Sequence, residues 1–132
     1  MINPIRGLAA AGILALAALA VPQPALHAAD GAAKMPSGEA LFRGRACAAC
    51  HSVKPGQNRA GPSLAGIVGQ PVAAAKGYSY SPALKQAGGK WDEKKLDAWL
   101  ADPKAVVPGT KMVTKVPSAQ DRAAIIAYLK AN

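Results

Sequence analysis

Cys47 and Cys50 are separated by two alanines and are followed directly by His51. Two cysteines three positions apart lie on one face of a helical turn, where each thiol could form a thioether to the edge of a porphyrin. The adjacent histidine could then reach the iron from one side of the ring. This order of residues is typical of the covalent attachment site of a c-type haem, so we expect a haem protein.

The same pair of cysteines has two other interpretations. In an exported protein it could form a disulfide or a redox-active dithiol of the thioredoxin type. That interpretation leaves His51 without a role and needs a βαβ pattern, which the surrounding sequence lacks. A zinc site usually needs four protein ligands, and the rest of the chain has no further cysteine and only His27. We therefore favour haem attachment.

The N-terminal segment has the pattern of a signal peptide. Arg6 gives it a basic start, residues 8–20 are an unbroken run of Ala, Leu, Ile and Gly, and prolines and small residues follow. The run is shorter than the roughly 20 residues of a transmembrane helix, so we expect no permanent membrane span. We expect cleavage near Ala28 or Ala29. Because thioether attachment needs reduced cysteines and haem delivered outside the cytoplasm, export predicts a location in the bacterial periplasm.

Removing residues 1–29 leaves residues 30–132, which have the size of a single small domain. This domain has one Phe, two Trp and three Tyr, so a large apolar cofactor would supply buried area that the side chains cannot. Only Arg6 of the 16 basic residues lies in the leader, which leaves 15 basic and 7 acidic residues. The basic residues are scattered and the expected compartment holds no nucleic acid. We therefore expect a monomer that docks transiently to redox proteins with acidic surfaces.

Residues that cap helix N-termini mark three main helices, at Ser37, Asp92 and Ser118. We expect the first helix to continue into the haem motif. The second should stop before Pro103, and the third should begin with a capping box formed by Ser118 and Asp121.

The remaining segments have the composition of loops. Residues 52–70 are rich in Gly and Pro, and residues 82–86 predict a short turn that ends at Gly88-Gly89. No segment predicts a sheet. The expected fold is all-α, with three main helices plus short turns and loops wrapped around one covalently attached haem.

The second axial ligand of the iron can be sought by elimination. His27 lies in the leader, so the remaining soft donors are Met35 and Met112. Met35 is too close in sequence to the attachment helix to arch over the far face of a haem, and we expect it to be an exposed or loosely packed linker residue. Met112 lies on an irregular stretch that can fold across. An isolated methionine more often fills a core, but the haem motif favours iron ligation here.

The domain resembles a class I cytochrome c over nearly its whole length, close to the mitochondrial type and to the small soluble bacterial monohaem carriers. The motifs that carry the resemblance, in the family's order, are Gly38 and Phe42, the haem motif at 47–51, Gly61-Pro62, Tyr80, Trp91, Pro103-Lys104, residues 108–112, and Ile125, Tyr128 and Leu129. The resemblance implies the class I cytochrome c fold and one haem c bound through Cys47 and Cys50. It also implies that His51 and Met112 are the axial ligands of the haem iron.

The resemblance further implies roles for residues of the haem pocket. The Pro62 carbonyl would accept a hydrogen bond from the ligand histidine, although an ordinary turn is the alternative. Tyr80 and Trp91 resemble the pair that binds a buried haem propionate, with simple core packing as the alternative. Trp99 stands where the family has a tyrosine beside the methionine sulfur, so we expect it to pack against the haem without the hydroxyl hydrogen bond.

Three further positions depart from the family. Gln70 replaces an arginine near the inner propionate, Leu84 replaces an asparagine, and Thr114 replaces an aromatic residue after the methionine. These changes leave the fold untouched but alter the charge and hydrogen bonding that set the reduction potential. They also leave the methionine side less crowded, so Lys111 or Lys115 could replace the methionine at high pH.

Axial ligands on both faces close an iron to substrates and suit one-electron transfer. We therefore expect a periplasmic electron carrier rather than an enzyme, with lysines such as Lys104 and Lys111 favouring docking near the exposed haem edge. Two alternatives stay open. One is a dedicated cytochrome subunit of a larger dehydrogenase or oxidase complex, and the other is an open-site haem sensor or enzyme in which Met112 does not hold the iron.

Overall fold

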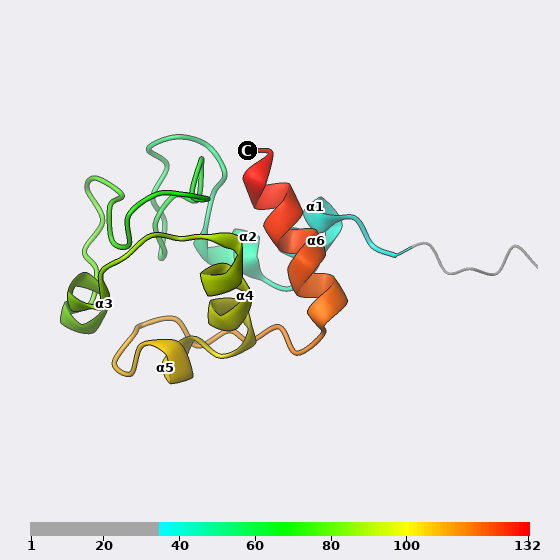
Figure 1. Ribbon diagram of the computed structural model, residues 1–132. Coiled ribbons are helices and arrows are strands. Elements are labelled where there is room, and N and C mark those ends of the chain that lie inside the picture. The colour runs from blue at the N-terminus through cyan, green and yellow to red at the C-terminus, as the bar shows by residue number, and fades with distance from the viewer. Residues whose placement is uncertain (1–34) are drawn as a thin grey trace, which may run out of the picture. The chain divides into compact units, whose positions relative to one another are not determined.

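The computed structural model describes residues 35–132, which form six helices joined by loops (Figure 1). The predicted leader, residues 1–29, lies outside this part of the chain. The helices are α1 (Gly38–Gly44), α2 (Cys47–Cys50), α3 (Pro82–Ala87), α4 (Glu93–Ala101), α5 (Pro103–Val106) and α6 (Ala119–Lys130). Residues 35–132 contain no strand, only an isolated bridge between Pro71 and Lys90. The prediction of an all-α fold is confirmed.

Helix α6 packs against both α1 and α4, and Figure 1 shows α1 beside α6. Gly38 lies where α1 meets α6, because a Cβ added there would lie 2.6 Å from the Tyr128 Cβ and would also collide with the Ala124 carbonyl. Phe42 packs on the Tyr128 ring, with 5.5 Å between the ring centroids. Ile125 is almost fully buried on the inner side of α6. These contacts hold together α1 and α6, which are the first and last helices of the described residues.

The three predicted N-caps are confirmed. The side chains of Ser37, Asp92 and Ser118 each accept a hydrogen bond from the backbone N–H three residues further on, at 3.2, 2.7 and 3.2 Å. The predicted capping box is only half formed, because the Asp121 carboxylate pairs with the Arg45 guanidinium. A guanidinium forms a stronger, charge-assisted hydrogen bond than a neutral backbone N–H does. The ion pair ties α6 to the segment that follows α1.

The first helix does not continue into the haem motif, contrary to the prediction. It ends at Gly44, and Ala46 adopts a left-handed conformation with a φ of 61°. A left-handed residue cannot belong to a right-handed helix, so the chain turns and begins a new four-residue helix at Cys47. The break lets α2 point in a different direction from α1.

Two short helices occur where the sequence predicted a turn and an irregular segment. Helix α3 is capped by Ser81 and ends at Ala87, directly before Gly88, which has a φ of 61°. Pro103 stops α4 as predicted, but it then begins α5, and the Asp102 side chain accepts a hydrogen bond from the Ala105 N–H. Proline is favourable at the first position of a helix because its φ is already helical and no N–H is needed there.

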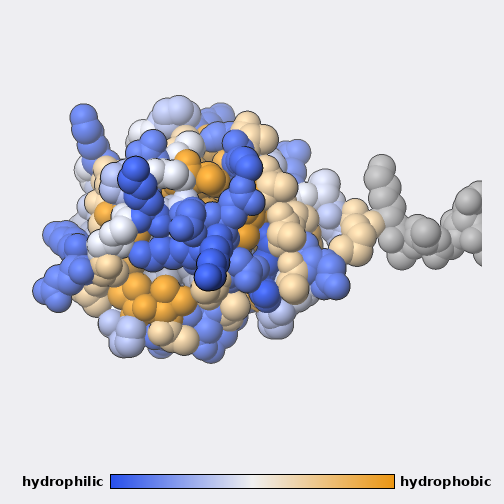
Figure 2. Space-filling model, in the orientation of Figure 1, coloured by the Kyte–Doolittle hydropathy of each residue, from blue (hydrophilic) through white to orange (hydrophobic). Residues whose placement is uncertain are grey.

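Hydrophilic side chains cover most of the face shown in Figure 2, between smaller hydrophobic patches. No helix within residues 35–132 is both long enough and apolar enough to cross a membrane.

Candidate functional site

All eight residues that the sequence predicted to attach the haem, to bind its iron or to form its pocket line one cavity. They are Cys47, Cys50, His51, Pro62, Tyr80, Trp91, Trp99 and Met112. Apolar side chains from four helices complete its walls, among them Phe42 of α1, Leu84 of α3, Leu96 of α4 and Ile125 of α6. The chain therefore brings its only cysteines, an imidazole and a thioether sulfur to the same apolar space at the centre of the helices.

Helix α2 is a single turn that presents both cysteines to this cavity. Cys47 is buried and Cys50 is exposed, and the two are not joined in a disulfide. Burial raises the pKa of the Cys47 thiol above its usual value, while the carbonyl of Arg45 is 4.0 Å from its Sγ. A planar group held by both sulfurs would thus have one attachment point inside the cavity and one at its exposed rim.

His51 follows α2 directly, in an extended conformation, and is half-buried. Its Nδ1 lies 2.8 Å from the Pro62 carbonyl oxygen. A carbonyl oxygen can only accept a hydrogen bond, so Nδ1 carries the proton and Nε2 keeps its lone pair. Burial lowers the pKa of His51, and the hydrogen bond to Pro62 offsets part of that effect. Burial therefore favours the neutral imidazole, the form that binds a metal, and the hydrogen bond to Pro62 selects the tautomer whose Nε2 is free to bind it.

Gly61 packs directly against the His51 ring. A Cβ added at Gly61 would lie 2.6 Å from Nδ1 and 2.9 Å from Nε2. No larger residue fits without moving the ring. The sequence indicated Gly61-Pro62 as a motif, but the steric role of the glycine is visible only in the structure.

Met112 is half-buried in the cavity and lies beside Trp99. The Trp99 Nε1–H donates a hydrogen bond to the Met112 Sδ, at 3.1 Å. The hydroxyl hydrogen bond of the family's tyrosine is absent, as expected, and the indole N–H of Trp99 donates to the sulfur in its place. A buried indole N–H needs an acceptor, and the thioether sulfur supplies one. Met35, in contrast, is 57% exposed, in agreement with its predicted linker role.

The segment around Met112 is fastened at several points. The Lys111 Nζ donates to the Ser79 carbonyl at 2.8 Å, and the Lys115 Nζ lies 2.6 Å from a carboxylate oxygen of Asp102. The hydrogen bond from Lys115 lowers the pKa of the Asp102 carboxyl. Both lysines that the sequence suggested as replacement ligands therefore hold the loop in place.

Tyr80 and Trp91 are buried, line the cavity and carry an O–H and an N–H donor. The Tyr80 Oη accepts a hydrogen bond from the Ala75 N–H at 3.1 Å, which leaves its own O–H proton to be donated, and burial raises the pKa of Tyr80. The Trp91 indole packs edge-to-face on Trp99, with 5.1 Å between ring centroids. Both side chains fit the propionate role as well as they fit core packing.

Sequence reasoning missed Tyr78. Its O–H donates to the Ala60 carbonyl at 2.9 Å and its ring packs edge-to-face against Tyr80. Tyr78 also lines the cavity. The alternation Tyr-Ser-Tyr at 78–80, which places both rings on one side of an extended chain, was the signal that could have found it.

The three departures from the family pattern are not equivalent. Leu84 and Thr114 line the cavity, Leu84 as a buried residue and Thr114 as an exposed one. Gln70 is exposed and does not line it. The loss of the family's arginine therefore changes the surroundings of the cavity rather than its wall.

The donor set of the cavity fits a haem iron. Imidazole and thioether are established axial ligands of c-type haems, and the apolar lining suits a porphyrin. Within residues 35–132 no three His, Cys, Asp or Glu side chains converge as they would around zinc.

Residues 36–132 match the family model described as "Cytochrome c". The chain belongs to the cytochrome c family. It is 48% identical over 85 residues to the cytochrome c2 iso-2 of Magnetospirillum fulvum, which covers 64% of this chain and 88% of that protein. It is 46% identical over 94 residues to the cytochrome c-type cyt cy of Rhodobacter capsulatus, which covers 70% of this chain but only 46% of that protein. The solved structure of cytochrome cH from Methylobacterium extorquens superposes with a TM-score of 0.67 at 45% identity, covering 72% of this chain and 95% of the other.

Family membership confirms the resemblance to class I cytochromes c and the expected fold. Cytochromes c bind haem c covalently, and this chain has the cysteine pair for that attachment. The chain is an electron-transfer protein of this family rather than an enzyme.

Proposed function

We propose that this cytochrome c is a periplasmic one-electron carrier whose haem is attached through Cys47 and Cys50 and whose iron is held by His51 and Met112. The observation that supports the proposal is the meeting of all four side chains in one apolar cavity. His51 comes from the end of α2, whereas Met112 comes from the distant loop between α5 and α6. The fold therefore gathers two iron donors that the sequence separates widely.

The bound haem would supply a single iron that alternates between the ferric and ferrous states. The protein's own residues would orient its ligands. The Pro62 carbonyl fixes the His51 tautomer, and the Trp99 N–H holds the Met112 sulfur. The Tyr80 O–H and the Trp91 N–H would serve as donors to a propionate.

With His51 and Met112 both bound, the iron would have no position left for a substrate, which would suit electron transfer rather than substrate chemistry. Electrons would pass near Cys50, the exposed attachment point. Lys111 and Val113 are exposed residues that line the same cavity. A basic residue next to an apolar one suits a small, salt-sensitive contact with an acidic redox partner. We propose that the protein docks in this way as a monomer.

Export and cleavage near Ala28 or Ala29 are also part of the proposal. The basic start and the short apolar run support them. Fractionation of cells that make the full chain, followed by N-terminal sequencing, tests both. The expected result is a haem protein in the periplasmic fraction that begins within a residue or two of Asp30.

The axial ligands are tested by the deep-red absorption band of the purified ferric protein, which arises from sulfur-to-iron charge transfer. We expect the band in the native protein, its loss in Met112→Ala and its retention in Met35→Ala. Met35 is the matched control because it is exposed and lies outside the cavity. A native protein that lacks the band and binds carbon monoxide when reduced would instead have an open iron site. If size-exclusion chromatography of the native extract recovers the protein only as part of a large complex, the protein would be a dedicated subunit of that complex.

A further inference from the structure

The carbonyl that accepts the His51 hydrogen bond belongs to a peptide group that is held from both sides. Its oxygen, on Pro62, accepts from the His51 Nδ1–H at 2.8 Å. Its N–H, on Ser63, donates to the Asn58 Oδ1 at 3.0 Å. The two hydrogen bonds therefore act on opposite ends of one planar amide.

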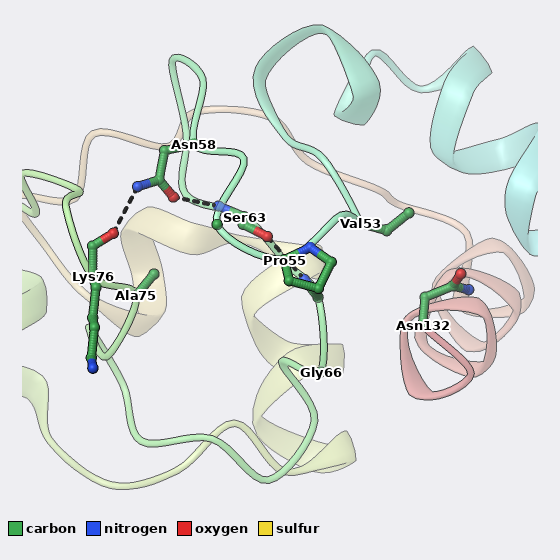
Figure 3. Close-up of a pocket in the computed structure, with 10 residues that line it drawn as sticks. Val53, Pro55, Asn58, Ser63, Gly66, Ala75, Lys76 and Asn132 are labelled. Atoms are coloured by element: carbon green, nitrogen blue, oxygen red, sulfur yellow. Dashed lines mark hydrogen bonds between the residues drawn. The ribbon is translucent and has the colours of Figure 1, made fainter.

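The Asn58 side chain continues this chain of hydrogen bonds. Its Nδ2 donates to the Lys76 carbonyl oxygen at 2.8 Å. Figure 3 shows Asn58 between Lys76 and Ser63, with both bonds marked, beside a hollow that Val53 and Gly66 also line. Both partners of Asn58 are backbone groups, one only a donor and the other only an acceptor, so the orientation of the amide is fixed. The four groups form one continuous series from Lys76 to His51.

Hydrogen bonds in such a series polarise one another. An acceptor on the Ser63 N–H draws positive charge toward it and makes the Pro62 carbonyl oxygen more negative. A more negative acceptor pulls the His51 Nδ1 proton more strongly and makes Nε2 a better electron donor. Greater donation to the iron stabilises the ferric state relative to the ferrous state.

We propose that Asn58 is a positioning residue that strengthens the donation of His51 to the iron and thereby lowers the reduction potential. This inference rests on the proposed ligation by His51. The role of Asn58 is separate from ligation, because Asn58 does not line the cavity and acts on His51 only through the Pro62–Ser63 peptide group.

The test compares the native holoprotein with Asn58→Ala and with Ser63→Ala. Asn58→Ala removes the acceptor for the Ser63 N–H, so we expect the reduction potential to rise by a two- to tenfold change in the redox equilibrium constant, about 18 to 59 mV. The His51 Nδ1–H resonance of the reduced protein should move upfield and exchange faster with water. Ser63→Ala is the matched control, because it removes the Ser63 Oγ bond to the Lys54 carbonyl in the same loop but keeps the Ser63 N–H. It should leave both readouts at their native values.

Asn58→Asp is the second variant, which covers the case that Asn58→Ala does not fold. It keeps an acceptor for the Ser63 N–H, so the Nδ1–H resonance should stay at or downfield of its native position. The proposal is overturned if Asn58→Ala shifts neither readout, if Ser63→Ala shifts both equally, or if Asn58→Asp moves the resonance upfield. The charge-transfer band, recorded on the same samples, reports separately whether the axial ligands are in place.

Discussion

Gly38 and Gly44 both belong to α1, and alanine at these two positions is expected to have opposite effects on stability. At Gly44 an added Cβ meets nothing within 4 Å, and alanine is about 0.5–1 kcal/mol more favourable than glycine in a helix. At Gly38 the same atom would lie 2.6 Å from the Tyr128 Cβ and 3.0 Å from the Ala124 carbonyl carbon, whereas ordinary contact begins at 3.4 Å. Because backbone atoms of α6 cannot rotate away, α1 must move, and overpacking of this kind costs about 1–3 kcal/mol.

Thermal unfolding of the two holoproteins measures this difference. One kcal/mol shifts the Tm of a domain of this size by about 4–8 °C. We therefore expect Gly38→Ala to unfold about 4 to 24 °C below the native protein and Gly44→Ala to unfold about 2 to 8 °C above it. The reasoning is refuted if Gly38→Ala unfolds at the native temperature, or if Gly44→Ala is destabilised as much as Gly38→Ala.

Three further substitutions test the site and its supports. Gly61→Ala places a Cβ against the His51 ring, so it should break the hydrogen bond to the Pro62 carbonyl, lower the Tm and upfield-shift or remove the Nδ1–H resonance; an unchanged resonance would contradict this. Trp99→Phe removes the N–H that draws electron density from the Met112 sulfur, so the sulfur should donate more strongly and the reduction potential should fall while the charge-transfer band remains. A potential that rises would argue against that role. Ala46→Gly should raise the free energy of unfolding in denaturant by about 0.5–1 kcal/mol. Glycine removes the cost of about 1–2 kcal/mol that a left-handed conformation imposes on an L-residue, but part of this gain is lost because glycine also gives the unfolded chain more conformational entropy. A loss of stability would show that Ala46 is not strained.

Local interactions made much of the helical structure predictable. Ser37, Asp92 and Ser118 cap the helices that the sequence assigned to them, because a cap needs only a side chain and a backbone N–H three residues away. The order Cys47, Cys50, His51 likewise places its three groups within one turn and predicts haem attachment without any knowledge of the fold.

The same local reasoning failed where a distant partner competed for a side chain. Asp121 was predicted to complete a capping box, but in the folded chain it faces the Arg45 guanidinium. Ala46 was predicted to lie within a helix, but the packing of α1 on α6 and of α2 on the cavity requires a sharp change of direction there. An alanine has no sequence signature for a left-handed conformation, so the break could not be foreseen.

Residue types and their spacing were enough to identify the groups that this protein has for binding a haem and for beginning its helices. Which groups they contact became clear only in the folded domain: the Trp99 indole donates to the Met112 sulfur, and the Asn58 amide lies behind the peptide that holds His51. The physical reason is that a buried donor or acceptor must find a partner, but its residue type does not specify which one. That choice depends on contacts between segments far apart in the chain, which form only when the whole domain packs.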